Sequence, residues 1–226
     1  GPIGHPLRTK VVRRGGDCND NRNTIIDKMK TQLIGRGKEL STLTTSLSVE
    51  GSLRTALIHG PKGMGKSAML DKTEQELIDC KKVHLCLSHK ATGYSNPLNF
   101  SASLARSARG SSDLIQSALN DFARKWGSLV ISFERSRVHE ENKDEWRIKL
   151  ANSLVGTLEE SLTAREISIN DITPVLILDD LDQYSDDGID WLTGPFNQAI
   201  RSSELFKRCR FLFSSESPNH SLQGAF

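Results

Sequence analysis

The residues from Gly60 to Ser67 have the types and spacing that phosphate binding requires. They read Gly-Pro-Lys-Gly-Met-Gly-Lys-Ser and fit the pattern G-x-x-x-x-G-K-[ST] at every fixed position. Glycines let the backbone curl so that several N–H groups point at one anion, and a following helix adds its free N–H groups and the positive end of its dipole. In this pattern Lys66 neutralises the β- and γ-phosphates and the Ser67 hydroxyl ligates Mg²⁺. The predicted phosphate-binding residues are Gly60, Pro61, Lys62, Gly63, Met64, Gly65, Lys66, Ser67 and Ala68.

A second segment offers the carboxylates that such a site needs. Val175 to Leu178 is a continuous apolar run followed directly by Asp179 and Asp180. Such a run is typical of a central parallel strand covered on both faces, and ligands bind at the carboxyl ends of these strands. Asp179 is then placed to hold Mg²⁺ opposite Ser67, and Asp180 to orient or deprotonate a water. For the loop from Gly60 to Ser67, the alternative is a glycine-rich turn that holds no ligand. For Asp179 and Asp180, it is a solvated acidic turn after a core strand.

The flanking segments predict the elements that position these residues. Residues 55–59 are expected to form a buried strand before the phosphate loop, and residues 68–80 a helix after it. Residues 82–87 and 210–213 are expected to be the second and fourth strands. Leucines at 40, 43 and 47 predict a helix before the first strand.

About 85 residues separate the second and third strands, more than an ordinary crossover uses. We therefore expect a helical insertion at about 98–170. One helical stripe is expected to begin at a capping box of Asp113 with Gln116 and to end at Gly127, and an exposed loop is expected over 135–145. The stripes are Leu114, Ile115, Ala118, Leu119, Phe122 and Trp126, and then Trp146, Leu150, Leu154, Leu158 and Leu162.

Composition favours one α/β unit preceded by a short tail. The 226 residues carry 30 basic and 28 acidic side chains, a net charge of +2, which does not indicate nucleic-acid binding by bulk electrostatics. Residues 1–31 are expected to be a flexible basic lead-in, in which Gly1-Pro2 resembles the remnant of a cleaved expression tag. Residues 32–226 are expected to be the folded core. The four scattered cysteines predict reduced thiols, no signal peptide or membrane span is evident, and the expected compartment is the cytoplasm or nucleus.

Four elements in this order resemble the P-loop ATPases of the AAA+ and STAND type, the latter including the NB-ARC and NACHT modules. Residues 33–40, Leu-Ile-Gly-Arg-Gly-Lys-Glu-Leu, are similar to the hhGRxxEL box, which also occurs in origin-recognition-like initiators. The phosphate loop and the apolar strand with its two acids follow. Residues 211–215, Phe-Leu-Phe-Ser-Ser, stand where the fourth strand ends in the sensor-1 residue.

The resemblance implies a three-layer α/β fold with a parallel sheet of order 5-1-4-3-2, in which we expect the fifth strand to be absent. It implies that Ile34, Gly35 and Arg36 bind the base end of ATP and that Ser214 or Ser215, of which we take Ser215, reads the γ-phosphate. The prediction that the bound base is adenine rather than guanine rests on this resemblance. Two departures are Asp180, where many active members have Glu, and Glu216, where NB-ARC proteins tend to have Arg.

The expected function is a STAND-type signalling switch that binds ATP and Mg²⁺ and hydrolyses the β–γ bond slowly, with Lys66, Asp180 and Ser215 as catalytic residues. The alternatives are a DNA-associated AAA+ ATPase of the origin-recognition or transposition type and a regulatory or scaffold module that binds nucleotide without hydrolysing it. Expected partners are ATP and ADP, a lid, effector and sensor domains outside these residues, and a nucleotide-dependent homo-oligomer; no membrane is expected.

Overall fold

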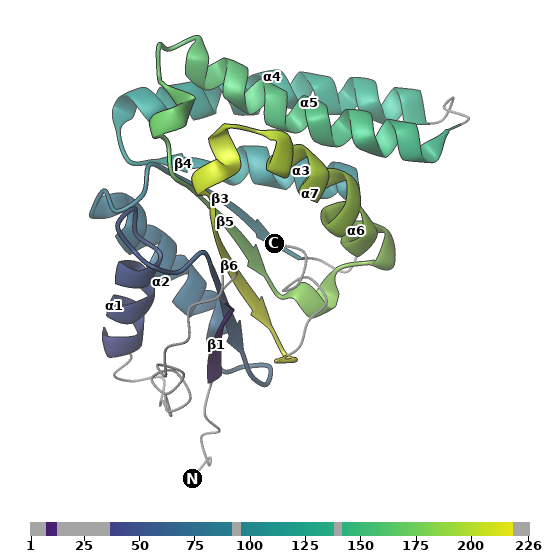
Figure 1. Ribbon diagram of the computed structural model, residues 1–226. Coiled ribbons are helices and arrows are strands. Elements are labelled where there is room, and N and C mark those ends of the chain that lie inside the picture. The colour runs from purple at the N-terminus through teal and green to yellow at the C-terminus, as the bar shows by residue number, and fades with distance from the viewer. Residues whose placement is uncertain (1–7, 13–36, 92–95, 138–141, 219–226) are drawn as a thin grey trace, which may run out of the picture.

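One mixed sheet separates two helical layers in the computed structural model, which describes residues 8–12, 37–91, 96–137 and 142–218 (Figure 1). The six strands of the sheet lie in the order β1-β2-β6-β5-β3-β4. Their bounds are β1 (Arg8–Val12), β2 (Thr55–His59), β3 (Leu85–Lys90), β4 (Arg109–Gly110), β5 (Pro174–Asp179) and β6 (Arg210–Ser215).

The four central strands are parallel and confirm the predicted fold class. β2, β6, β5 and β3 are the expected first, fourth, third and second strands, and they are neighbours in that order. Because all four run the same way, their carboxyl ends meet at one edge of the sheet. The phosphate loop follows β2 and the two acids follow β5, so the fold brings both to that edge.

Two strands differ from the sequence prediction. β3 begins at Leu85, not at Lys82, because its ladder with β5 starts where Leu85 lies opposite Pro174. Residues 8–12, expected to belong to a flexible lead-in, form β1, which pairs antiparallel with β2. This segment contains three β-branched residues, which favour strands. β1 takes the position beside β2 where the family order has its fifth strand.

The helices divide between the two faces of the sheet, as Figure 1 shows. On one face lie α1 (Gly37–Ser46) and α2 (Lys66–Asp79). On the other lie α3 (Pro97–Ser107), α4 (Asp113–Arg137), α5 (Lys143–Thr163), α6 (Asp186–Trp191) and α7 (Asn197–Ser202), with a π-helical turn η3 (Leu192–Phe196) between the last two. Short 3₁₀ turns complete the chain at η1 (Ile169–Asp171), η2 (Leu181–Gln183) and η4 (Leu205–Arg208).

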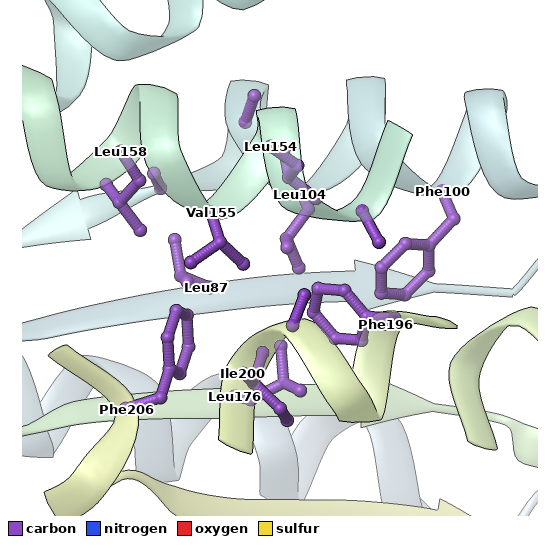
Figure 2. Packing of buried hydrophobic residues seen from close by; sticks show 14 of the residues in the cluster. Leu87, Phe100, Leu104, Leu154, Val155, Leu158, Leu176, Phe196, Ile200 and Phe206 are labelled. Atoms are coloured by element: carbon purple, nitrogen blue, oxygen red, sulfur yellow. The ribbon is translucent and has the colours of Figure 1, made fainter. Parts of the chain in front are cut away.

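Alternate residues of the central strands enter different cores, as the period of two requires. In β2, Ala56 and Ile58 join the core under α1 and α2, whereas Leu57 joins the larger core under α3 to α7. Figure 2 shows the larger core, where Leu154, Val155 and Leu158 of α5 lie above side chains of the sheet and of α7. Its labelled members include Leu87, Phe100, Leu104, Leu176, Phe196, Ile200 and Phe206.

The chain between β3 and β5 folds as α3, β4 and the long helices α4 and α5. The stripe from Trp146 to Leu162 is buried as predicted, and so is the first stripe except for Leu114, which is 53% exposed. Gly127 does not end its helix, and α4 continues to Arg137. Residues 135–137 and 143–145 of the predicted loop are therefore helical, and 138–141 lie outside the described residues.

The predicted capping box at the start of α4 is displaced by one residue. Ser112 precedes the helix, and its Oγ accepts a hydrogen bond from the Ile115 N–H at 3.3 Å. Gln116 reaches back to accept from the Gly110 N–H at 2.9 Å. Both side chains satisfy donors near the helix start, which is the purpose of a capping box.

None of the helices in the described parts of the chain has both the length and the apolar character needed to cross a bilayer. Within the same parts there is no cluster of three or more His, Cys, Asp or Glu suited to a metal. Cys80, Cys86 and Cys209 are free thiols, as expected, and Cys18 lies outside the described residues.

Candidate nucleotide-binding site

The loop between β2 and α2 has the backbone that a phosphate nest requires. Three of its glycines have positive φ: Gly60 at 152°, Gly63 at 84° and Gly65 at 76°. L-residues with a Cβ rarely adopt such angles, so the loop needs glycine at these positions. Gly65 is the residue directly before α2, so the loop ends at the N-terminus of a helix that is 14 residues long. Free N–H groups and the helix dipole favour an anion there.

Lys66 lies folded against the loop. Its side chain is buried, and Nζ donates to the carbonyl oxygen of Gly60 at 2.6 Å and to that of Pro61 at 3.2 Å. A lysine ammonium has three donors and no acceptor, so these contacts hold the positive charge at the phosphate loop. Ser67 is half-buried in the first turn of α2.

The remaining loop positions contribute mainly backbone. Pro61, Lys62, Gly63 and Ala68 are exposed, while Met64 packs against the core under α1 and α2. The loop is fastened to the neighbouring strand, because the Gly60 N–H donates to the Ser215 carbonyl at 3.2 Å. The predicted base-binding residues Ile34, Gly35 and Arg36 lie outside the described residues.

Asp179 and Ser214 are in direct contact at the carboxyl ends of β5 and β6. Asp179 is 7% exposed, and its Oδ1 accepts a hydrogen bond from the Ser214 hydroxyl. The same Ser214 Oγ accepts from the Asp180 N–H at 2.8 Å. One hydroxyl therefore connects both acids of the site.

Asp180 has an unusual backbone and a shifted pKa. Its φ of 58° and ψ of 54° place it in the left-handed region, where residues other than glycine are uncommon and often functional. Burial raises the pKa of Asp180, the negative charge of Asp179 raises it further, and the positive charge of Lys66 opposes both. The charge of Lys66 therefore acts on Asp180, in agreement with the common edge of the sheet at which the loop and the acids lie.

The two serines at the end of β6 differ in position. Successive residues of a strand point to opposite faces, so Ser214 shares the α2 face with Leu212, and Ser215 shares the other face with Phe213. The Ser215 hydroxyl donates to the Ser217 carbonyl. Ser215, our choice for the sensor, is therefore tied to the loop through its backbone, while Ser214 is the serine whose hydroxyl contacts the acids.

Lys90 is a candidate that the sequence did not reveal. It ends β3, and its Nζ lies 3.9 Å from Asp179 Oδ2, with 68% of its side chain exposed. No motif marks it, since its place beside Asp179 depends on the register of β3 against β5. It supplies a second positive charge next to the buried carboxylate.

Tyr184 is a second residue that sequence reasoning missed. It follows η2 and is buried; burial raises the pKa of its phenol, and the charges of Asp179 and Asp180 raise it further. Its ring lies 5.4 Å from that of His89 and 6.4 Å from that of Phe100, so it joins the acids to the larger core.

The oxygen ligands and the positive groups of this site fit a nucleotide with bound Mg²⁺. Mg²⁺ prefers hard oxygen ligands, and Asp179 offers a buried carboxylate. The second oxygen of this carboxylate has a long contact of 3.9 Å to Lys90. The left-handed glycines and Lys66 fit phosphate oxygens.

A family model described as an AAA ATPase domain matches residues 32–198. The chain belongs to this family. The match includes the phosphate loop and both acids of this AAA ATPase domain, and it ends before β6. Neither the curated proteins nor the solved structures contain a match to the chain. Family membership agrees with the parallel sheet and indicates nucleotide binding at the loop.

Proposed function

We propose that this domain binds ATP with Mg²⁺ at the loop from Gly60 to Ala68 and hydrolyses the β–γ bond slowly. The observation that carries the proposal is the Ser214 hydroxyl, which contacts Asp179 and Asp180 beside a loop whose lysine charge acts on Asp180. A phosphate cradle, a buried metal-binding carboxylate and a second acid with a raised pKa are the parts that phosphoryl transfer needs.

Each residue has a defined role in the proposed reaction. Lys66 leaves the carbonyls of Gly60 and Pro61 for the phosphates. Ser67 and Asp179 would hold the cation, which would neutralise charge on the phosphate oxygens. Asp180 accepts a proton from water as the water oxygen bonds to the γ-phosphorus. The bond from that phosphorus to the bridging oxygen breaks, and ADP and phosphate leave.

We infer further that the domain works as a STAND-type switch rather than as a motor. Asp180 has one methylene fewer than glutamate, so its carboxylate reaches a shorter distance towards the water. Slow hydrolysis suits a protein in which the bound nucleotide sets the conformational state and loss of the γ-phosphate releases it. Tyr184 supports a link between site and core, since the charges of Asp179 and Asp180 raise the pKa of its phenol while its ring packs with Phe100.

The test is calorimetry with ATP and GTP in the presence of Mg²⁺, together with phosphate release. Lys66→Ala is expected to weaken ATP binding by about a hundredfold, because it removes a charge that contacts phosphate directly. Lys72→Ala is the matched control, since Lys72 is an exposed lysine further along the same helix. ATP affinity that is equal in both variants would contradict the site.

Asp180→Asn separates the switch from the non-hydrolysing scaffold. If Asp180 is the base, the variant keeps ATP affinity and loses most of its phosphate release. Unchanged release in Asp180→Asn, or none in the parent protein, would favour the scaffold. Fast turnover stimulated by duplex DNA would favour the DNA-associated ATPase.

A further inference from the structure

Two adjoining hollows lie at the end of the sheet opposite to the phosphate loop. One has a volume of about 190 Å³ and the other about 340 Å³, and Arg54 and Lys207 line both. Arg54 precedes β2, Thr173 precedes β5 and Lys207 lies in η4 before β6, so the hollows face the amino ends of these parallel strands. Strands of this length separate the two ends by about 16–20 Å. The hollows are therefore distinct from the nucleotide site.

The described lining of these hollows is strongly basic. It contains no Asp or Glu, and five of its side chains are positively charged: Arg54, Arg201, Lys207, Arg208 and Arg210. One of these charges is compensated from outside the lining, since Lys207 pairs with Glu204 at 2.5 Å. Arg201 donates to the neutral side chain of Asn197, a lining residue, at 3.0 Å. The five positive side chains of the lining carry more charge than the single carboxylate of Glu204 balances.

Arg210 gives the hollows a positioned donor group. Its Nη2 donates to the Gly51 carbonyl at 3.1 Å, with a longer contact of 3.4 Å to that of Val49, and this fixes the guanidinium against the loop before β2. Its Nε is buried and has no hydrogen-bond partner among the described residues. Burial lowers the pKa of Arg210, and the nearby charge of Arg54 lowers it further. Two guanidinium groups held close together repel each other, and a bound anion relieves that repulsion.

We propose that these hollows form a second phosphate-binding site, independent of the nucleotide site, for a ligand that carries more than one phosphate group. Guanidinium groups bind phosphate oxygens through paired hydrogen bonds, which explains why arginines predominate. Two hollows with shared cations suit adjacent phosphates. The ligand is either a compact polyphosphate or a run of nucleic-acid backbone phosphates, and both present the same chemistry.

The experiment measures binding of inorganic tripolyphosphate and of a short single-stranded oligonucleotide in the Lys66→Ala background, where the phosphate loop lacks its buried lysine. Both probes are titrated by calorimetry into this chain, into the same chain with Arg54→Gln and Lys207→Gln, and into a control with Arg135→Gln. Arg135 is an exposed arginine on α4. Melting temperatures establish that all variants are folded.

We expect at least one probe to bind and the Arg54/Lys207 substitutions to weaken it by about tenfold or more, while Arg135→Gln changes little. Tripolyphosphate binding identifies a compact ligand, whereas oligonucleotide binding alone, with a steep salt dependence, identifies backbone phosphates. Binding of neither probe, or equal weakening by the control, overturns the proposal. ATP binding by the Arg54/Lys207 variant with Lys66 intact tests the nucleotide site separately.

Discussion

Ser214 is the residue through which the two acids of the site are connected. Its hydroxyl donates to Asp179 and accepts from the Asp180 backbone, so it fixes a carboxylate and the start of the left-handed turn together. Asp179 is buried, and a buried carboxylate needs such a donor to offset the loss of water. Asp180 depends on the same hydroxyl for its position.

Ser214→Ala is therefore expected to reduce phosphate release by about tenfold or more, with ATP affinity changed much less, because the hydroxyl aligns groups that act in the transition state. Steady-state phosphate release and calorimetry measure the two quantities. Ser215→Ala is the matched control, since that hydroxyl contacts the Ser217 carbonyl instead. A larger loss of turnover in Ser215→Ala would instead support Ser215, our sequence-based choice, as the sensor.

The sequence predicts the loop and the acids because local patterns mark both. It cannot distinguish Ser214 from Ser215, because β6 is buried on both faces and its apolar residues show no alternation that would tell which serine faces α2. Lys90 and Tyr184 could not be predicted from the sequence for another reason. Lys90 lies beside Asp179 only through the register of β3 against β5, and Tyr184 joins the larger core only through the turn after β5.

The helix α4 is the element that departs furthest from its sequence pattern. Glycine in a helix interior costs about 1 kcal/mol relative to alanine, which is too little to end a helix whose flanks pack. Trp126 is buried on one side of Gly127, and Val130 and Phe133 pack against the core on the other. Packing thus extends the helix to Arg137, and Trp146 of α5 donates to the Phe133 carbonyl at 3.1 Å.

Gly127→Ala should raise the free energy of unfolding by about 0.5–1 kcal/mol. A Cβ at this exposed position meets no atom within 4 Å, so the substitution restricts the unfolded chain without a clash. Chemical denaturation measures the change. The contrasting variant is Gly63→Ala, which also has open space but needs φ of +84°, and it should lower stability. Destabilisation by Gly127→Ala would show that α4 is strained there.

The sequence predicts that the central strands exist more accurately than it predicts where each one begins and ends. Continuous apolar runs located β2, β5 and β6 within two residues, since a fully buried strand differs from its surroundings. β3 begins and ends three residues later than the sequence predicts. Its second half, Ser-His-Lys, is polar and shows no strand pattern, and its register is set by pairing with β5. β1 is an edge strand, and its polar and basic residues resemble those of a tail.

At the scale of the whole molecule, the sheet divides the interior into two cores of unequal size. The larger one holds a buried histidine, His89 of β3, whose ring meets those of Phe100 at 4.8 Å and Tyr184 at 5.4 Å. Burial lowers the pKa of His89 to about 4 from the ordinary 6.5. The folded protein therefore keeps this side chain neutral at pH values where the unfolded chain protonates it.

This difference predicts a loss of stability on mild acidification. Between pH 6.5 and about 4 the unfolded state binds the proton more tightly, so stability decreases as pH falls, by at most about 3 kcal/mol from this group. His84, whose pKa burial also lowers, acts in the same direction, while Glu74 and Asp180, with raised pKa values, act against it.

The contribution of His89 is isolated by comparing denaturation midpoints from pH 7 to 4.5 in the parent protein and in His89→Leu. The variant should show a shallower decline, whatever its stability at pH 7, because only the titration of this residue has been removed. Parallel declines would mean that His89 protonates without cost in the folded state.

All three tryptophans of the chain lie in the larger core: Trp126 on α4, Trp146 on α5 and Trp191 on α6. Each is at most 4% exposed. Trp191 stacks on Phe196 at 5.1 Å, and Phe100 touches both rings and also Tyr184, next to the acids. The intrinsic fluorescence of the protein is therefore an optical signal from the helical layer alone. An emission change on adding ATP would record a rearrangement of that layer, without any dye having been attached.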